Sequence, residues 1–353
     1  PLTLAVTTPQ AARPGTDYPV MVWIHGGRFE VGDHTDPTPN PEGLAQRGVV
    51  VVRVGYRLKF EGFLPLHTDP PAHYRGVADC AEALAWIQRN IEAFGGDPTN
   101  VTLVGHSAGA AIALWLTRRD HYKGEFRRAI IASPGFPRAG FEGRKWAARG
   151  AVSTPLTREA LNRLAADNPA RLERGYRRFR RRYPTDAAVG PFLFDATELA
   201  EVDMVVSSTR EEFTAQARSI DRLGLGPAFV RVMGRSLGLK KGAAGRYIDA
   251  VHHSRHHSGR RDVAGQFVTD ALIRRWVDEV CEHAPGNVWQ AEFPAGAHST
   301  ELASVFAGEY TDWLVSYLRG EGVGWEGYGS RRQAMCVGEG VTRDPLGYLR
   351  GCF

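Results

Sequence analysis

The sequence predicts an α/β fold with a mostly parallel central sheet and helices on both faces. Its strand-like runs are short, rich in β-branched residues and continuous rather than alternating, as expected of strands buried on both faces. Helical patterns separate these runs, and an alternation of strands and helices favours a parallel sheet. The runs cover residues 19–25, 49–55, 101–105, 128–133, 202–208 and 287–293.

The length is compatible with one large domain. At 353 residues the chain is long for a single domain, although α/β folds of this size with one sheet are common. Residues 136–200 break the alternation, because they are helical and arginine-rich and contain no convincing strand. We therefore expect a single domain over residues 1–353, with a helical insertion at about 136–200.

The charge balance excludes some partners. The formal net charge is only +5, so no global field calls for a nucleic acid or an anionic membrane. No apolar run approaches the roughly 20 residues needed to cross a bilayer. We expect a soluble protein with no membrane span and no nucleic-acid partner. The residues do not specify an oligomeric state.

One segment concentrates positive charge. Seven arginines share the thirteen positions 171–183 with Leu172, Tyr176, Phe179 and Tyr183, which are spaced 4, 3 and 4 apart. This spacing predicts a helix with one apolar face. A solvated arginine face is the favoured interpretation, and an anion-binding or partner surface is the alternative.

The pentapeptide GHSAG at 105–109 fits the pattern G-x-S-x-G, and its setting suits the motif. A strand-like run precedes it and the apolar helix AAIALWL follows it. The backbone is crowded at such a turn, so glycines are needed at 105 and 109. The hydroxyl of Ser107 then stands above the sheet edge near a helix N-terminus, which stabilises developing negative charge. Ser107 is therefore a candidate nucleophile.

A serine hydroxyl needs a base, usually a histidine that a carboxylate orients. In folds with this motif the chain order is serine, acid, histidine, so the histidine should follow the last strand. Of the twelve histidines, only His298 lies in the loop just past residues 287–293. The acid should follow an intervening strand. Glu211 and Glu212 both come directly after residues 202–208, and their position alone does not choose between them.

A glycine-rich loop after an early strand can hold the oxyanion of an acyl-transfer reaction. Gly26 and Gly27 lie in such a loop and let the main chain turn its amides inward. The amide of Ala108, next to the serine, should complete the set. A simple tight turn is the alternative for the two glycines.

Histidine and cysteine spacings give no metal site. The cluster of His252, His253, His256 and His257 has no carboxylate or cysteine to complete a ligand shell, and we expect adventitious surface histidines. The four cysteines show no C-x-x-C spacing. A reducing environment, slightly favouring the cytoplasm, is the default. A bridge between Cys336 and Cys352 is the alternative.

Seven segments in the same order resemble the type-B carboxylesterase family, which also contains cholinesterases and bacterial p-nitrobenzyl esterases. Because they run colinearly across nearly the whole chain, the set is far more specific than any single motif. The segments are residues 19–29, 56–66, 83–110, 125–135, 208–213, 296–306 and 313–335.

The resemblance implies an α/β-hydrolase fold with Ser107 as nucleophile and His298 as base. It also selects Glu212 as the triad acid, because the family's threonine, basic, acidic, glutamate run falls on residues 209–212. The positions of the family's oxyanion donors are Gly27, Arg28 and Ala108. The resemblance further implies a structural ion pair between Arg57 and Asp79.

Four substitutions depart from the family pattern without removing a catalytic group. His106 replaces the usual glutamate before the serine, and Phe213 replaces the glycine that normally follows the acid. Gly55 replaces the asparagine that normally precedes the segment 56–58. Arg28 stands where the family usually has glycine or alanine. We expect its side chain to narrow the site and to favour acyl groups with a carboxylate or another polar group.

The chain also begins differently from the family. Residues 2–9 are normally preceded by a substantial N-terminal segment, and the chain has no initiator methionine or signal peptide at its start. We therefore expect an excerpt or a processed product.

Together these features predict a carboxylesterase that acts on a small-molecule ester through an acyl-enzyme, with no metal and no cofactor. His298 deprotonates Ser107, Glu212 stabilises the imidazolium, and backbone amides hold the oxyanion. An amidase or carbamate hydrolase with the same triad is one alternative. A non-catalytic binding protein is another, because the family includes adhesion members that lost the triad.

Overall fold

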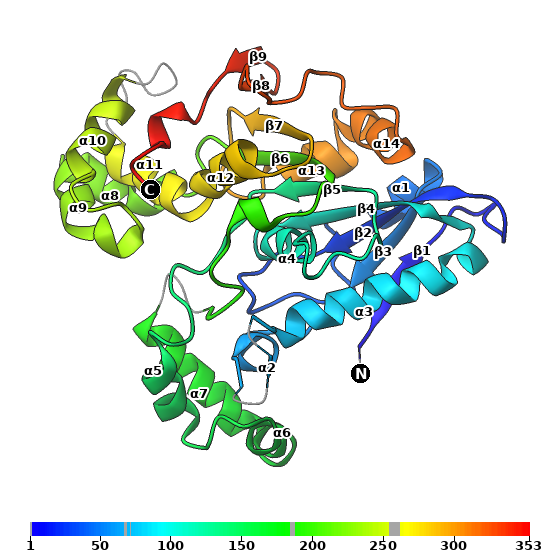
Figure 1. Ribbon diagram of the computed structural model, residues 1–353, viewed down its shortest axis with the longest axis horizontal. Helices are drawn as coiled ribbons and strands as arrows, with labels where there is room; N and C mark the ends of the chain where they lie inside the picture. The colour runs from blue at the N-terminus through cyan, green and yellow to red at the C-terminus, as the bar shows by residue number, and fades with distance from the viewer. Residues whose placement is uncertain (1, 67–68, 71, 184–187, 254–261) are drawn as a thin grey trace.

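The computed structural model describes residues 2–66, 69–70, 72–183, 188–253 and 262–353. Within these ranges nine strands form one sheet in the order β1-β3-β2-β4-β5-β6-β7-β8-β9 (Figure 1). The two edge strands pair antiparallel with their neighbours, and the other pairs are parallel. The predicted α/β class with a mostly parallel sheet is confirmed.

The strands follow the predicted runs closely. All six predicted strands are present, and the sheet adds β1 at one edge and the short β8 and β9 at the other. The strands are β1 (Leu4–Thr7), β2 (Tyr18–Ile24), β3 (Val50–Val54), β4 (Gly96–His106), β5 (Arg128–Ala132), β6 (Asp203–Thr209), β7 (Val288–Phe293), β8 (Gln333–Cys336) and β9 (Gly340–Arg343).

The continuous apolar runs arise because each central strand contributes to two cores. Val20, Val22 and Ile24 of β2 belong to a core on one face, whereas Met21 and Trp23 belong to a core on the other. Successive strand residues point to opposite faces, so both positions must be apolar when helices cover both.

Helices that bury apolar side chains against the sheet cover both of its faces (Figure 1). The first face carries α3, with Cys80, Leu84 and Ile87 buried, together with α4 and α12. The second face carries α1, α13 and α14. Their bounds are α1 (Pro41–Gln46), α3 (Arg75–Asn90), α4 (Ala108–Leu116), α12 (Arg275–His283), α13 (Glu301–Ala307) and α14 (Thr311–Arg319). The short elements α2 (Lys59–Phe63) and η1 (Ile91–Phe94) precede and follow α3, and η6 (Gly347–Leu349) follows β9.

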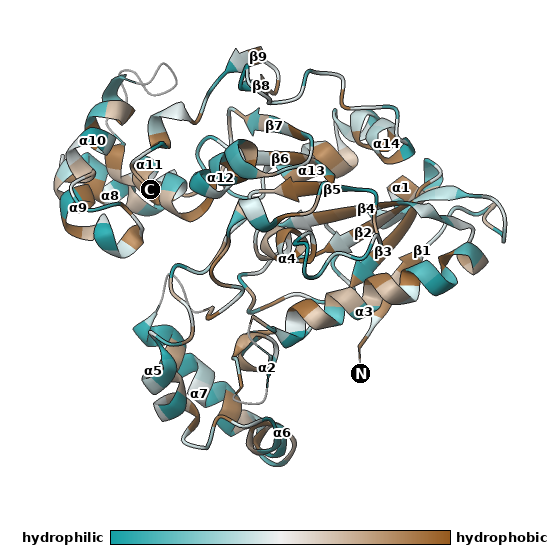
Figure 2. Cartoon of the chain, viewed as in Figure 1, coloured by the Kyte–Doolittle hydropathy of each residue, from teal (hydrophilic) through white to brown (hydrophobic). Residues whose placement is uncertain are grey.

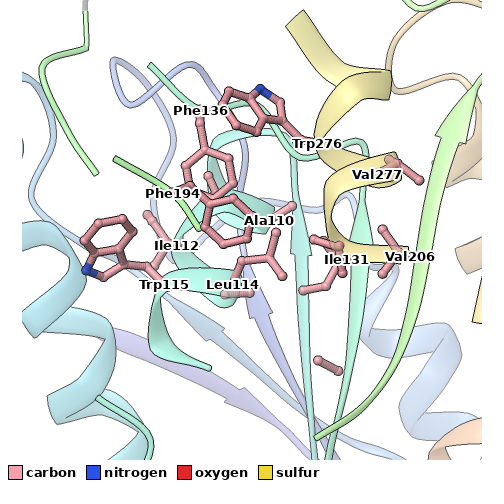
Figure 3. Packing of buried hydrophobic residues seen from close by; sticks show 14 of the residues in the cluster. Ala110, Ile112, Leu114, Trp115, Ile131, Phe136, Phe194, Val206, Trp276 and Val277 are labelled. Atoms are coloured by element: carbon pink, nitrogen blue, oxygen red, sulfur yellow. The ribbon is translucent and has the colours of Figure 1, made fainter. Parts of the chain in front are cut away.

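The helix after Ser107 is buried on all sides. Every residue of α4 is buried, and Ile112 and Leu114 lie within the first core. Figure 3 shows Phe136, Phe194 and Trp276 gathered beside this helix. The rings of Phe136 and Phe194 stack with centroids 4.3 Å apart. A helix enclosed in this way gives the preceding turn a rigid support.

A first helical region follows β5. It contains α5 (Lys145–Val152), α6 (Arg158–Asp167), α7 (Pro169–Arg182) and the 3-10 segment η2 (Ala196–Glu198), which lies within the expected insertion at 136–200. On α7, Leu172, Tyr176 and Phe179 are buried and the arginines are exposed, as the spacing predicts. This region has its own apolar core. The expectation of one domain stays a prediction.

A second helical region follows β6, and sequence analysis did not single it out. It forms the lobe at the left of Figure 1. Its elements before α12 are η3 (Thr214–Ala217), α8 (Arg218–Arg222), α9 (Gly226–Met233), η4 (Arg235–Leu237), α10 (Ala244–His253), α11 (Val263–Thr269) and the π-helical turn η5 (Asp270–Arg274).

A buried ionic cluster fixes this region to the sheet. The guanidinium of Arg274 is fully buried between Asp270 and Glu292 of β7. Tyr247 of α10 and Tyr348 near the C-terminus both donate hydrogen bonds to the Asp270 carboxylate, at 2.6 and 2.9 Å. Because each charge has a partner, the cluster can stay buried.

Other predictions concern features outside the sheet. The described helices are too short or too polar to cross a bilayer. In the described ranges no three His, Cys, Asp or Glu side chains are grouped as metal ligands. His252 and His253 end α10, while His256 and His257 lie outside the described residues. All four cysteines are buried free thiols, so the alternative of a bridge between Cys336 and Cys352 is wrong.

Candidate active site

Ser107 lies at a sharp turn between β4 and α4. Its backbone has φ 54° and ψ −116°, which is unusual for a residue with a side chain. A Cβ added to Gly105 would lie 2.4 Å from the Gly109 carbonyl oxygen, and one added to Gly109 would lie 2.0 Å from the Ile24 carbonyl oxygen. Both glycines are therefore required by the close approach of backbone, as the motif predicts.

The structure brings Ser107 together with His298 and Glu212. The Nε2 atom of His298 lies 2.9 Å from the Ser107 hydroxyl oxygen, and its Nδ1 atom lies 2.5 Å from Oε2 of Glu212. The backbone amide of His298 also donates to the Glu212 carbonyl oxygen. The backbone bond holds the main chain of His298 next to Glu212, and the side-chain bond orients the imidazole so that the ring presents Nε2 to the serine.

The Glu212 carboxylate is only 1% exposed and is held on its other side. Its Oε1 atom accepts hydrogen bonds from the Thr209 amide and from the Ser133 hydroxyl, each at 2.7 Å. Thr209 ends β6, and Ser133 directly follows β5. Adjacent strand ends thus orient the carboxylate. Glu211, the other candidate acid, is partly exposed.

The glycine-rich loop lies beside the serine. A Cβ added to Gly26 would lie 3.3 Å from the Ser107 Cβ. Gly27 has φ 98°, and a Cβ there would lie 2.1 Å from the Val31 carbonyl oxygen, so glycine is needed. The next residue, Arg28, also has a positive φ of 60°. The loop therefore makes a tight left-handed turn next to Ser107.

A buried carboxylate connects this loop to α7. Glu30 accepts hydrogen bonds from the Tyr176 hydroxyl at 3.0 Å and from the Arg180 guanidinium at 2.9 Å. Burial, with the adjacent Glu30 charge, raises the pKa of Tyr176. The loop is also held by a hydrogen bond from the Lys59 amide to the Phe29 carbonyl oxygen. Residues 27–30 thus have partners in the first helical region and in α2.

Two hollows open beside Ser107 and His298. The first is a cavity of about 440 Å³ with largely apolar walls, including Phe136, Phe213, Phe229, Leu237, Leu272 and Ile273. The second, of about 590 Å³, is more open, and its lining includes the glycine-rich loop, Asp36 and Ser299. Arg28 borders both hollows, and Ala108 borders the first. Space is therefore open on two sides of the serine.

His106, the residue before the serine, is buried and neutral. Its ring lies beside that of His298, with centroids 4.8 Å apart. Burial, and then the neighbouring His298, lower the pKa of His106 to about 3. A neutral ring at this position does not oppose the positive charge that His298 acquires when it takes a proton.

A second buried carboxylate, Glu301, was missed by sequence analysis. It begins α13, and its Oε1 atom lies 3.3 Å from the Ser133 hydroxyl and 4.0 Å from His106 Nε2. Burial, and then the Glu212 charge, raise the pKa of Glu301 to about 7. Ser133 thus touches both carboxylates. Ser133 is the last residue of the predicted run 128–133, at the edge that carries Ser107, and this position is the signal that could have found Ser133.

The predicted ion pair between Arg57 and Asp79 is present. Nη2 of Arg57 lies 2.6 Å from the buried Asp79 carboxylate, which also accepts from the Arg57 amide. The pair joins the segment after β3 to α3, and neither residue is among those that line the two hollows. It is a structural contact, as the resemblance implies.

Comparison with known proteins shows a sequence likeness in the first part of the chain. Residues 1–150 match the profile of the carboxylesterase family. The para-nitrobenzyl esterase of Bacillus subtilis is 45% identical over 123 residues, which are 34% of this chain and 25% of that protein. The juvenile hormone esterase of Heliothis virescens is 41% identical over 115 residues, or 33% of this chain and 20% of that protein. The matches therefore span only a quarter or less of these two relatives.

Solved structures extend the likeness to the whole chain. A PNB esterase structure superposes with a TM-score of 0.75 at 23% identity, covering 99% of this chain and 84% of that one. The Geobacillus stearothermophilus carboxylesterase EST55 gives a TM-score of 0.76 at 21% identity, covering 100% and 85%. At such identities the superposition shows the fold. Residues 1–150 therefore resemble the carboxylesterase family in sequence, and the whole chain has the fold of these two esterase structures.

Proposed function

We propose that this chain hydrolyses carboxylic esters with Ser107 as nucleophile, His298 as general base and Glu212 as the orienting acid. The observation that carries the proposal is the unbroken hydrogen-bonded path from the Glu212 carboxylate through both nitrogens of His298 to the Ser107 hydroxyl. Glu212 and His298 lie beyond the segment that matches the family profile. Their roles therefore rest on this geometry.

The reaction begins when Nε2 of His298 takes the proton of Ser107 as its oxygen attacks the ester carbonyl. The buried Glu212 carboxylate stabilises the imidazolium, and neutral His106 leaves that charge unopposed. His298 then protonates the leaving alcohol, and an acyl-enzyme remains on Ser107. Water, deprotonated by the same imidazole, releases the acid and restores the serine.

The oxyanion of each tetrahedral intermediate would accept hydrogen bonds from the backbone amides of Gly27, Arg28 and Ala108. The first two lie in the tight turn of the glycine-rich loop, and the third begins α4. Amides fixed before the reaction stabilise developing charge without reorganising. The helix N-terminus adds a favourable dipole. These steps use side chains, backbone amides and water, and they call for no cofactor.

The substrate we propose is a small ester with one apolar and one polar part. The apolar cavity of about 440 Å³ is large enough for an aromatic or medium-length aliphatic group. The more open hollow accommodates a polar part next to Arg28 and Asp36. Amides and carbamates are cleaved by the same machinery when the leaving group is protonated well, and we treat them as outcomes of the test.

The decisive experiment combines active-site labelling with turnover. A fluorophosphonate should form one adduct, located at Ser107 by mass spectrometry, and p-nitrophenyl esters of short and long acids should be hydrolysed. The exposed Ser219 provides a matched control, since Ser219→Ala should leave labelling and turnover unchanged. Labelling elsewhere, or cleavage of matched p-nitroanilides in preference to the esters, would contradict the proposal. Absence of both labelling and turnover would favour a binding protein.

A further inference from the structure

The outer surface of α8 and α9 carries apolar side chains that nothing in the described chain covers. Leu223, Leu225 and Val232 are 73%, 51% and 77% exposed, and Met233 is 38% exposed. We call these four residues, together with the exposed Ala228, the α8–α9 surface. Figure 2 shows hydrophobic and hydrophilic colours alternating along this part of the lobe. Scattered exposed leucines are ordinary, but four large apolar residues within eleven positions form a patch.

The spacing places three of these residues on one side of α9. Leu225 caps the helix, and Ala228 and Val232 follow at intervals of three and four. Residues with these intervals share a helix face. Val230, on another side of the helix, is fully buried. The helix is therefore apolar toward the protein and also apolar toward the outside.

Positive charge surrounds the apolar patch. Residues 213–246 contain seven basic residues and one acidic residue, a balance of +6, whereas the whole chain carries +5. The seven are all exposed: Arg218, Arg222, Arg231, Arg235, Lys240, Lys241 and Arg246. The acidic residue, Asp221, is partly buried and accepts hydrogen bonds from the amides of Ala264 and Gly265.

These cations are not neutralised within the described residues. Arg246 donates to the Gly351 carbonyl oxygen, and none of the other six forms an ion pair with another described side chain. Such a surface attracts a polyanion. Two copies of this chain related by a twofold axis would bring the same cations face to face, which disfavours self-association through the patch. A nucleic acid would leave the apolar side chains in water.

The patch continues into the candidate active site. Met233 is part of the α8–α9 surface and also lines the 440 Å³ cavity that contains Ser107 and His298. Ile220 of α8 and Phe229 of α9 line the same cavity. A hydrophobic molecule held at the patch would therefore lie next to the cavity and could enter it without crossing bulk water.

We propose that the α8–α9 surface docks on an anionic lipid surface, with Leu223, Leu225 and Val232 entering the acyl boundary and the surrounding arginines and lysines contacting phosphate groups. Interfacial segments commonly combine an apolar face with flanking cations in this way. Delivery of a hydrophobic ester from that surface to Ser107 rests on the proposed function, whereas docking does not.

Vesicle sedimentation with the full chain carrying Ser107→Ala tests docking without turnover. Binding is expected to vesicles of phosphatidylcholine mixed with phosphatidylglycerol, to weaken as salt rises, and to be much weaker with phosphatidylcholine alone. Replacing the pair Arg222 and Arg231 by glutamine should weaken binding about 25-fold, since each cation near such a surface contributes about a factor of five. Replacing Leu225 and Val232 by serine should weaken it at least as much.

The first helical region offers a charge-matched control. Arg174 and Arg178 of α7 are equally exposed and have no ion-pair partner among the described residues. Replacing both by glutamine removes the same charge and should change vesicle binding less than about twofold, because the cations there flank no exposed apolar patch. Equal losses from the two pairs of arginine variants would overturn the proposal in favour of non-specific charge attraction.

Two further outcomes separate docking from the proposed function. With Ser107 restored, the Leu225 and Val232 variant should lose hydrolysis of a long-chain ester embedded in anionic vesicles, yet keep hydrolysis of a soluble short-chain ester. Turnover of soluble esters without vesicle binding would overturn docking and leave the proposed esterase activity intact. Vesicle binding without turnover of any ester would support docking and overturn the proposed esterase activity. A change in oligomeric state in these variants, with vesicle binding unchanged, would assign the patch to a second copy of the chain.

Discussion

The two helical regions have similar composition but different relations to the site. The first, with α5, α6 and α7, encloses its own apolar core and contacts the glycine-rich loop through the hydrogen bonds of Glu30. The second, between β6 and β7, shares its apolar residues with the cavity beside Ser107 and leaves others exposed on α8 and α9. The first holds the glycine-rich loop in place, and the second lines the cavity beside Ser107.

This difference shows that charge alone does not identify a binding surface. The arginines of α7 lie opposite an apolar face that is covered, and they are exposed or contact carboxylates and a backbone carbonyl oxygen. The basic residues around α9 lie beside apolar side chains that are not covered. Trp146 of α5 is also exposed, but it stands alone among the described helices of the first region, whereas four exposed apolar residues lie within eleven positions of the second. Clustered apolar exposure, more than charge, distinguishes the two regions.

The largest expected effect comes from replacing the proposed catalytic residues at the sheet edge, which both helical regions border. Ser107→Ala and His298→Ala should each lower kcat/KM by roughly 10⁵-fold or more, whatever the ester. The double variant should lose little beyond either single variant, because triad members act as a unit. The measurement is turnover of a soluble p-nitrophenyl ester. Strictly additive losses would place the two residues in separate roles.

The next effect is a change of stability with pH that arises at the sheet edge, outside both helical regions. The folded protein raises the pKa of Glu301 from 4.5 to about 7, so between these values it binds more protons than the unfolded chain. Its stability therefore falls as pH rises through that window. Glutamine does not titrate, so Glu301→Gln should gain about 3 kcal/mol of unfolding free energy relative to the wild type over this range.

Denaturant unfolding of both proteins at the two ends of the window measures this gain. In the folded wild type Glu301 is half ionised at the upper end of the window, although it is buried close to the Glu212 carboxylate, and it is almost entirely neutral at the lower end. A difference between the two proteins that stays constant with pH would show that Glu301 titrates as it does in the unfolded chain.

A third prediction breaks the contact between the first helical region and the glycine-rich loop. Glu30→Gln removes the carboxylate that receives the Tyr176 hydroxyl and the Arg180 guanidinium. The free energy of unfolding should fall by about 2 kcal/mol, the usual cost of impairing a buried charge-assisted hydrogen bond. Turnover should fall about tenfold as well, because the loop carries two of the proposed oxyanion amides.

Glu173→Gln, also affecting a contact of α7, is the control. Glu173 pairs with Lys59 and Arg177 on the surface, and its side chain is 38% exposed. Its replacement should cost less than about 1 kcal/mol and leave turnover unchanged. Equal effects of the two substitutions would mean that α7 supports the loop no more than any surface contact does.

Sequence reasoning found the parts of this molecule that depend on local patterns. The six central strands were predicted because burial on both faces requires continuous β-branched runs, and the Ser107 turn because glycine is needed where backbones approach closely. His298 followed from chain order. Glu212 could not be separated from Glu211 by position, and only the family resemblance favoured it.

The missed features depend on long-range contacts. In the second helical region the helices before α12 are short, and the π-helical turn at Asp270–Arg274 interrupts the 3.6-residue period that a pattern search needs. Arg274 looks like a surface charge until its buried partners are known. Glu301, in the first turn of a helix, resembles an ordinary dipole partner, and only the fold places it beside Ser133.

The smallest expected effect concerns Arg28, which borders both hollows at the serine. Its backbone has φ 60°, a conformation that glycine adopts without strain, so Arg28→Gly deletes the side chain while keeping the amide. If the guanidinium contacts the acyl group, the variant should lose about tenfold in its preference for an acyl group with a terminal carboxylate over a neutral one of equal length. The readout is the ratio of kcat/KM values for the two esters. Arg138, which also lines the apolar cavity, is the control, since Arg138→Gln alters the cavity charge without approaching the oxyanion loop. Unchanged preference in the Arg28 variant would show that the guanidinium is turned away from the acyl group, and that the helical walls alone select the substrate.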